Sequence, residues 1–161
     1  MQPGNQAALS LGNLLATSVR AHADEPFLGT RRHGTWEWIT YGEFADEVEH
    51  ARAGLALLGV TKGDRVAIIS DNREEWAVCA YGTYTLGAVW VPMYEAQHQA
   101  EWRYIIEDSG AKVLIVASDR IREIIAGFRD ALPTLEHVVV IDTEEDDSLA
   151  ALLDVGTETP A

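Results

Sequence analysis

The sequence contains a single cysteine, Cys79, in 161 residues. One cysteine cannot form a disulfide within the chain or build a cysteine-rich metal site, so a disulfide-stabilised secreted scaffold is excluded. Hydrophobic residues make up 47% of the chain, which excludes a disordered protein. The length predicts one domain, large enough to bury a hydrophobic core, since domains average about 150 residues.

Basic residues are also scarce. The chain has 12 Lys and Arg against 26 Asp and Glu, a formal net charge of −14. Nucleic acids and anionic membrane surfaces bind proteins through basic surfaces, so the composition argues against both as partners. The acids are concentrated at one end, because seven acids and no Lys or Arg lie between Asp142 and Ala161. We interpret Asp142 to Asp147 as a solvated loop, followed by a short helix at Leu149–Leu153.

Long apolar runs are absent. No stretch approaches 18 consecutive apolar residues, so the sequence predicts no membrane-spanning helix. Residues 1–20 lack the basic start and the long apolar core of a signal peptide. We therefore expect a cytoplasmic protein.

The motifs of several enzyme classes are missing as well. The sequence has neither G-x-G-x-x-G nor G-x-x-x-x-G-K-[ST], so it offers no glycine-rich phosphate loop. It has no G-x-S-x-G, and Ser70, which follows a predicted strand, fits a helix cap better than a nucleophile. The five histidines show no metal-ligand spacing such as H-x-x-x-H. These patterns assign no residue a catalytic or metal-binding role.

What the sequence does contain is an alternation of apolar strands and helices. Nearly continuous apolar runs predict strands at 65–70, 88–92, 112–116 and 138–141. Helices are predicted between them at 73–86, 101–108 and 119–130. This order predicts an α/β fold with a mostly parallel sheet that has helices on both faces. An N-terminal helix at 10–23 and a β-hairpin, with strands at 26–32 and 35–39, precede the sheet.

Local signals mark several helix ends. Thr40 and Glu43 form a capping box, in which each side chain accepts a hydrogen bond from the other residue's backbone N–H. Gly59 suits the left-handed end of the helix that follows. Asn72 is expected to cap helix 73–86, whose apolar residues are spread around the helix. The tryptophans are expected to anchor the core or an interface: Trp36, Trp38, Trp76, Trp90 and Trp102.

One group of basic side chains is a candidate anion site. Arg120 and Arg122 lie at the predicted start of a helix, and Arg129 lies two turns later. Arginines beside the free N–H groups of a helix start can bind a phosphate. Alternatively, the arginines solvate an amphipathic helix and pair with Glu123 and Asp130. The residues alone leave both interpretations open.

Five motifs follow one another in an order and at spacings that point to a family. They are Ile39-Thr40-Tyr41-Gly42-Glu43-Phe44, the segment from Gly54 to Ala67, Asn72-x-x-Glu75-Trp76, the segment from Gly87 to Tyr94, and the segment from Tyr104 to Leu114. Together they resemble the N-terminal part of the AMP-forming acyl-CoA synthetases, the adenylate-forming superfamily, over roughly residues 8–155. The segments 72–76 and 92–94 are most similar to the long-chain fatty acid branch.

The resemblance implies a ligase that activates a carboxylate. The carboxylate attacks the α-phosphate of ATP, which gives an acyl-adenylate and pyrophosphate, and the thiol of coenzyme A then displaces AMP. For the intact enzyme the resemblance implies ATP, Mg²⁺, coenzyme A and a fatty acid. It also implies a location in the cytoplasm or at the periphery of a membrane. This chain alone is expected to bind none of the cofactors. By position, the resemblance also implies that Arg120 or Arg122 contacts the 3′-phosphate of coenzyme A.

The sequence departs from the family in its extent. The family's phosphate loop, its ribose-binding aspartate and its C-terminal lysine do not occur before Ala161. We therefore expect residues 1–161 to be an N-terminal subdomain, with 1–9 and 142–161 as flexible ends, that is inactive alone. The alternative is a stand-alone α/β interaction or regulatory domain. We also expect self-association through helix 73–86, which should strengthen as salt screens the net charge.

Overall fold

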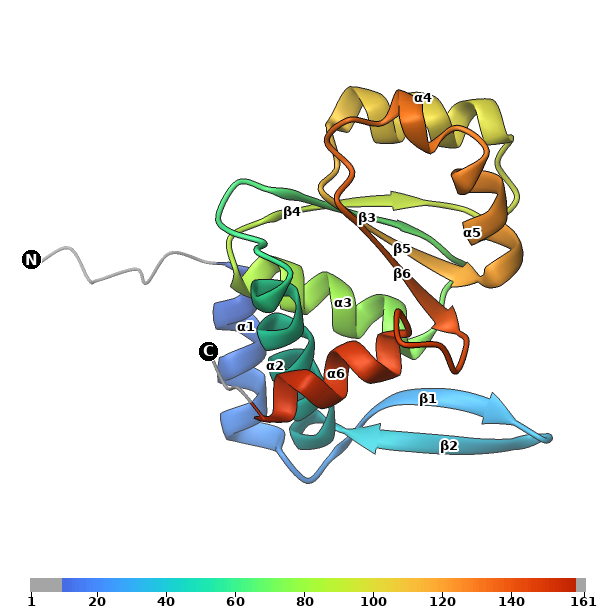
Figure 1. The fold of residues 1–161 in the computed structure, drawn as a ribbon. Helices are drawn as coiled ribbons and strands as arrows, with labels where there is room; N and C mark the ends of the chain where they lie inside the picture. Colours follow the sequence, from blue (N-terminus) through green and yellow to red (C-terminus); the bar gives the residue numbers. More distant parts are fainter. Residues whose placement is uncertain (1–9, 159–161) are drawn as a thin grey trace, which may run out of the picture. The chain divides into compact units, whose positions relative to one another are not determined.

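The helices and strands follow the predicted order, an α/β arrangement preceded by a helix and a hairpin (Figure 1). The computed structural model describes residues 10–158, so the expected flexible end at 1–9 lies outside the described residues. The elements are α1 (Leu11–His22), β1 (Pro26–Arg32), β2 (Thr35–Thr40), α2 (Tyr41–Leu57), β3 (Arg65–Ile69), α3 (Glu74–Thr85), β4 (Val89–Met93), α4 (Gln99–Ser109), β5 (Val113–Ser118), α5 (Asp119–Ala126), the 3-10 helix η1 (Arg129–Ala131), β6 (His137–Asp142) and α6 (Leu149–Glu158). The chain divides into two compact units, Met1–Asp46 and Glu47–Ala161.

The first unit contains α1 and an antiparallel hairpin of β1 and β2. Ser10 caps α1, because its hydroxyl accepts a hydrogen bond from the Asn13 N–H at 3.1 Å. Trp36 and Trp38 share one face of β2, as their spacing predicts, and their ring centroids are 6.0 Å apart. Both side chains are exposed, so neither anchors the core, and a role as interface anchors stays a prediction.

The predicted capping box starts α2, which runs from the first unit into the second. The Thr40 N–H donates to a Glu43 carboxylate oxygen at 2.8 Å, and the Glu43 N–H donates to the Thr40 hydroxyl at 3.1 Å. The prediction for this helix start is therefore confirmed. After the helix ends, Gly59 has φ +77°, a left-handed conformation that glycine adopts without steric cost.

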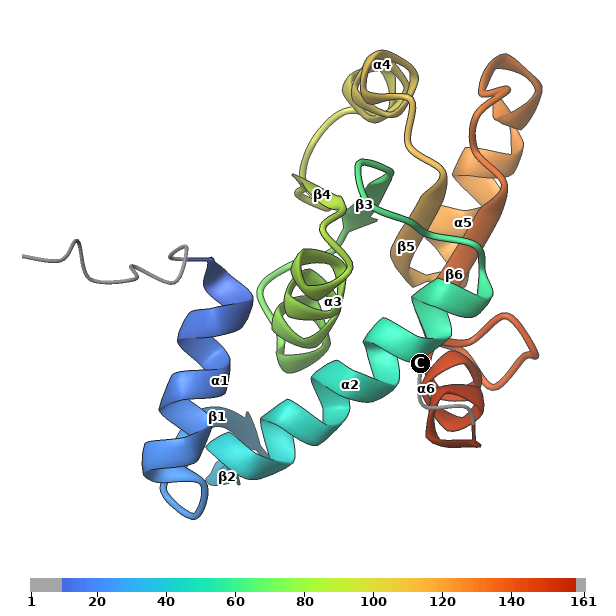
Figure 2. The ribbon, with the colours of Figure 1, turned by 90° about the vertical axis from the view of Figure 1, so that its left-hand side faces the viewer.

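The second unit is built around one sheet with the strand order β4-β3-β5-β6, and every neighbouring pair is parallel. Helices α4 and α5 cover one face, while α3, α6 and the end of α2 cover the other, as both views show (Figures 1 and 2). The predicted fold class is confirmed. Because both faces are covered, the strands are apolar along their length rather than alternating.

Two hydrophobic cores lie on the two faces of this sheet. Residues of β3, β5 and their neighbours divide between them by alternation along each strand. The core under α4 and α5 includes Ala67, Ile69, Met93, Trp102, Ile106, Leu114, Val116, Ile121 and Ile125. The core under α2, α3 and α6 includes Leu55, Val66, Ile68, Cys79, Ala80, Trp90, Val113, Ile115 and Leu149.

Helix α3 differs from its prediction in two ways. It begins at Glu74 with Arg73 as the N-cap residue and no side-chain capping bond, so the expected Asn72 cap is wrong. Its apolar residues are also largely covered, because Val78 and Cys79 are buried and Gly82 lies directly against Ala51 of α2. The apolar surface expected to drive self-association is therefore filled within the unit, and self-association stays a prediction.

Three other helix boundaries differ for local reasons. Helix α4 begins two residues early, because the Glu101 carboxylate accepts a hydrogen bond from the His98 N–H at 2.9 Å. Helix α5 ends at Ala126 instead of residue 130, since Gly127, a poor helix former, follows it. Helix α6 continues to Glu158 rather than ending at Leu153, and Leu149 at its start is buried.

Two glycines allow α6 to lie close to α2. A Cβ atom at Gly54 of α2 would lie 2.6 Å from the backbone oxygen of Leu152 in α6. A Cβ atom at Gly156 of α6 would likewise overlap the backbone of His50 in α2. A larger residue at either position would separate the helices, because backbone atoms cannot move aside as a flexible side chain can.

We predict that Gly54→Ala lowers the free energy of unfolding by about 1–2 kcal/mol, because overpacking outweighs the gain in helix propensity. Urea unfolding at pH 7 measures the change. Leu57→Ala is the matched control, since this side chain lies on the same helix and is half exposed. It should change stability by less than about 0.5 kcal/mol. A Gly54→Ala variant as stable as the original chain would contradict the close contact of α2 with α6.

Candidate functional site

The strand order identifies one edge of the sheet as the place to look for a site. β3 and β5 are neighbours, but the helices that follow them, α3 and α5, lie on opposite faces of the sheet. In open parallel sheets, ligands bind outside the carboxyl ends of the strands at such a point, because the two diverging loops leave a crevice. The loops that follow β3, β4, β5 and β6 therefore form the candidate site.

A cavity of about 330 Å³ lies at the carboxyl ends of β3 and β4. Its lining comprises Ser70, Asn72, Trp76, Pro92, Met93 and Tyr94. The buried Ser70 hydroxyl donates to the backbone oxygen of Asp71 at 2.9 Å, so it neither caps α3, as the sequence suggested, nor lies free in the cavity. No histidine is among the lining residues, so the described residues offer no base that would make Ser70 a nucleophile.

An arginine bridges this edge of the sheet. The Arg73 guanidinium donates to both carboxylate oxygens of Asp142, at 2.8 and 2.9 Å, and to both of Glu75, at 2.9 and 3.2 Å. Because β5 separates β3 from β6, Arg73 reaches across the carboxyl end of β5 to make these bonds. They raise the pKa of Arg73 above its usual range, with the bond to Asp142 contributing most. In turn, the hydrogen bond from Arg73 lowers the pKa of Asp142.

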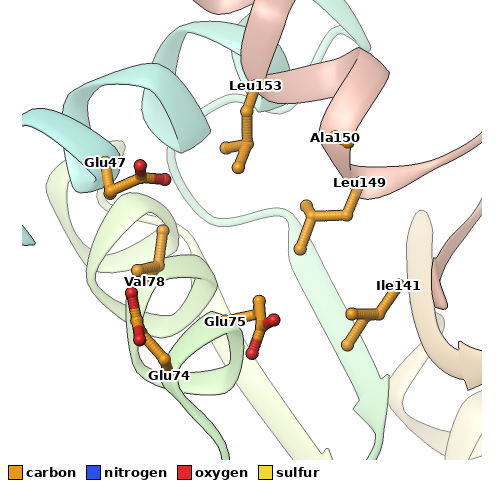
Figure 3. A pocket seen from close by; sticks show the side chains of 8 residues that line it. All are labelled: Glu47, Glu74, Glu75, Val78, Ile141, Leu149, Ala150 and Leu153. Carbon is orange, nitrogen blue, oxygen red and sulfur yellow. The ribbon is translucent and has the colours of Figure 1, made fainter. Parts of the chain in front are cut away.

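A second cavity, of about 230 Å³, lies between α2, α3, α6 and the end of β6. Figure 3 shows its side chains, which combine three carboxylates with apolar groups from α3, β6 and α6. The acids are Glu47, Glu74 and Glu75, and the other residues are Val78, Ile141, Leu149, Ala150 and Leu153. Carboxylates repel a phosphate, so this cavity does not suit a nucleotide.

The single cysteine takes no part in either cavity. Cys79 is buried, and burial raises the pKa of its thiol to about 12, with the carboxylates of Glu75 and Glu47 adding to the rise. A thiol that stays protonated at neutral pH is a poor nucleophile and a poor metal ligand. Cys79 is therefore a core residue.

The two arginines singled out by the sequence both lie in the first turn of α5, in different surroundings. The Arg122 guanidinium donates to both oxygens of Asp147, at 2.8 and 3.0 Å, and pairs with Asp119 at 2.8 Å. Arg120 is exposed, and within residues 10–158 its side chain has no hydrogen bond or ion pair. Residues two apart on a helix do not face each other. The side chains of Arg120 and Arg122 therefore leave the helix in different directions, and one flat group of a ligand cannot contact both.

The alternative pairing expected for these arginines is wrong. Arg122 pairs with Asp119 and Asp147 instead of Glu123 or Asp130, and its hydrogen bonds to Asp147 raise its pKa. Arg129 donates to the backbone oxygens of Leu135 and Glu136, at 2.6 and 2.9 Å, and so stabilises the turn before β6. Of the three arginines, only Arg120 has no side-chain partner among residues 10–158, and Arg122 would have to leave a carboxylate in order to bind another anion.

Sequence patterns missed the partners that come from distant segments. Asp147 is 25 residues from Arg122, and Asp142 is 69 residues from Arg73. The acidic run from Asp142 to Asp147 was the available signal, because two of its members pair with arginines at the sheet edge while staying partly exposed to solvent. Among residues 10–158, no group of three or more His, Cys, Asp or Glu is arranged to hold a metal ion.

Comparison with known proteins places this geometry in one family. A model of the AMP-binding enzyme family matches residues 15–160. The long-chain-fatty-acid–CoA ligase FadD15 of Mycobacterium bovis is 35% identical over 123 residues, which cover 76% of this chain and 20% of that protein. The chain thus spans about a fifth of the length of this curated relative. Within the described part of the chain, no helix is long and apolar enough to cross a membrane.

Solved structures agree with the sequence comparison. The anthranilate CoA ligase AuaEII in complex with anthranoyl-AMP has a TM-score of 0.80 and 27% identity, over 94% of this chain and 28% of that one. The N-terminal domain of FACL13 from Mycobacterium tuberculosis has a TM-score of 0.79 and 26% identity, over 95% of this chain and 38% of that one. The shared fold extends over nearly the whole of this chain.

We predict a pH-dependent contribution of the Arg73 bridge to stability. Asp142 has a lowered pKa in the folded state, so its stabilisation is present above pH 4 and disappears as the pH falls through the folded pKa. At pH 7, Arg73→Ala should lower the free energy of unfolding by up to about 1 kcal/mol, since the pair is partly exposed. At pH 2.5, roughly a unit below the pKa of a free carboxyl, the difference should be smaller than at pH 7, because Asp142 loses its charge as the pH falls through its lowered pKa.

Chemical denaturation at both pH values measures this effect. Arg103→Ala, at an exposed position on α4, is the control and should leave stability unchanged at either pH. An equal loss at both pH values for Arg73→Ala would show that the arginine stabilises the fold by packing and not through its charge.

Proposed function

Because this chain belongs to the AMP-binding enzyme family, we propose that it forms the N-terminal part of an ATP-dependent acyl-CoA ligase. In this reaction a carboxylate attacks the α-phosphate of ATP, which releases pyrophosphate, and coenzyme A then displaces AMP from the acyl-adenylate. The observation that supports the proposal most strongly is the family match over residues 15–160, together with a fold shared with acyl-CoA ligases at a TM-score of 0.80.

We propose a long-chain fatty acid as the carboxylate substrate. Several relatives are named long-chain-fatty-acid–CoA ligases, among them those of Mycobacterium bovis, Rattus norvegicus and Homo sapiens. The segments Asn72 to Trp76 and Pro92 to Tyr94 carry the same similarity, and both line the cavity at the carboxyl ends of β3 and β4. The intact enzyme would work in the cytoplasm or at the periphery of a membrane, where such substrates partition.

The proposed role of this chain is structural support for the reaction. It supplies a rigid sheet that is covered by helices on both faces. Its described residues do not provide a ligand set for the Mg²⁺ that accompanies ATP in such ligases. It also has no glycine-rich loop to hold the phosphates of ATP. We therefore expect the chain alone to form no acyl-adenylate.

A pyrophosphate-release assay tests this expectation. The 161-residue chain is incubated with ATP, Mg²⁺ and palmitate, and heat-denatured chain is the control. We predict no release above the control, because the chain has no glycine-rich loop to hold the phosphates of ATP while the adenylyl group is transferred. Palmitate-dependent release of pyrophosphate above the control would contradict the proposal that this chain only supports the reaction structurally.

The second element of the proposal is a contact between α5 and the 3′-phosphate of coenzyme A. Two observations support it. The first turn of α5 offers free backbone N–H groups, and Arg120 and Arg122 lie in that turn. Arg120 is exposed and unpaired within the described residues, whereas Arg122 must exchange an acidic partner for the phosphate.

In the intact enzyme, Arg122→Ala should raise KM for coenzyme A about ten-fold, the effect expected for one charge-assisted hydrogen bond, and leave KM for ATP unchanged. Arg103→Ala is again the control, because this exposed arginine belongs to α4 and not to the first turn of α5. Dephospho-coenzyme A, which lacks the 3′-phosphate, separates this contact from others. If Arg122→Ala impaired both forms of coenzyme A equally, the assigned phosphate contact would be wrong.

A further inference from the structure

Arg122 is contacted by acids from two different elements. Asp119 lies one turn earlier on the same helix, with an ion-pair distance of 2.8 Å. Asp147 comes from the loop between β6 and α6, and both of its oxygens accept hydrogen bonds from the Arg122 Nη1, at 2.8 and 3.0 Å. The side chains of Arg122 and Asp147 are 34% and 40% exposed, so a solute can reach the pair.

The backbone around Asp147 is positioned without help from its carboxylate. The backbone oxygen of Asp147 accepts a hydrogen bond from the Val140 N–H of β6 at 2.9 Å. The next residue, Ser148, is buried, and its hydroxyl accepts a hydrogen bond from the Ala151 N–H at 3.0 Å. The carboxylate of Asp147 can therefore release Arg122 while the loop stays in place.

We propose that Asp147 is an internal competitor for the anion site, which a phosphate ester must displace from Arg122 in order to bind. This inference rests on the proposed contact of α5 with coenzyme A. A carboxylate carries one negative charge, whereas a phosphate monoester carries about 1.5 to 2 near pH 7 and offers three acceptor oxygens. A monoester can therefore displace Asp147, while a singly charged phosphodiester or carboxylate competes on equal terms.

The surrounding charge strengthens this selection. Asp147 ends the acidic run, and Glu145 in the same loop also acts electrostatically on Arg122. Once displaced, Asp147 stays near the bound phosphate and repels it, because its backbone is fixed. Asp147 therefore lowers the affinity of the site for every anion and makes it selective for the most highly charged one. It is a specificity-determining residue that acts through Arg122.

Isothermal titration calorimetry of the intact enzyme tests the inference with coenzyme A and dephospho-coenzyme A as probes. Asp147→Asn removes the competing charge and keeps the size of the side chain. We predict that it increases the affinity for coenzyme A about five-fold, the scale of a partly exposed ion pair, and leaves the affinity for dephospho-coenzyme A unchanged. Glu144→Gln, at an exposed position of the same loop, is the matched control and should change either affinity by less than about two-fold.

Arg122→Ala separates this inference from the proposed function. If Arg122→Ala weakens binding of coenzyme A while Asp147→Asn binds it no better than the original protein, the competitor role is wrong and the phosphate contact stands. If Arg122→Ala has no effect, both the competitor role of Asp147 and the phosphate contact are wrong. Both are also wrong if neither the original protein nor Asp147→Asn prefers coenzyme A over dephospho-coenzyme A. If only Asp147→Asn prefers coenzyme A over dephospho-coenzyme A, the result supports competition between Asp147 and the phosphate for Arg122. Asp147→Ser, which removes the same charge, replaces Asp147→Asn if thermal unfolding shows that the latter is not folded.

Discussion

Burial of a parallel sheet on both faces is the constraint on which the rest of the second unit depends. Strands β3 and β5 occupy the centre, and their residues from Val66 to Ile69 and from Val113 to Ala117 are buried. Two separate helical layers are needed to cover them, so α3 and α5 leave neighbouring strands in opposite directions. That divergence creates the crevice at the carboxyl ends of the strands. The position of the candidate site is therefore a consequence of how the sheet is covered.

Sequence patterns predicted the elements well where local chemistry decides them. The apolar runs gave all four strands of the sheet to within two residues, and the Thr40–Glu43 box gave the start of α2. Contacts between distant elements were harder to predict. The apolar residues of helix 73–86 were expected to leave a surface for self-association, but Gly82 permits α2 to lie against this helix. Trp36 and Trp38 were expected to anchor the core or an interface, and both are exposed because a two-stranded hairpin leaves one face without cover.

The candidate site was only partly predictable for the same reason. Arg120 and Arg122 could be found from their place after a strand and at the start of a helix, together with the family resemblance. The partner of Arg122, Asp147, could not be found, because the pairing depends on how the loop after β6 returns to the sheet through the Val140 N–H. The bridge from Arg73 to Asp142 follows from strand order, which no local pattern encodes. An acidic run read as a solvated loop thus supplies two arginine partners.

The central claim is that the carboxyl edge of this sheet, at the start of α5, binds the 3′-phosphate of coenzyme A. A crystal structure of the intact enzyme with coenzyme A bound tests it most directly. The account predicts the 3′-phosphate within hydrogen-bond distance of Arg120 or Arg122, with the Asp147 carboxylate turned away from any guanidinium that the phosphate contacts. A 3′-phosphate bound away from α5, with Arg122 still paired to Asp147, would contradict it.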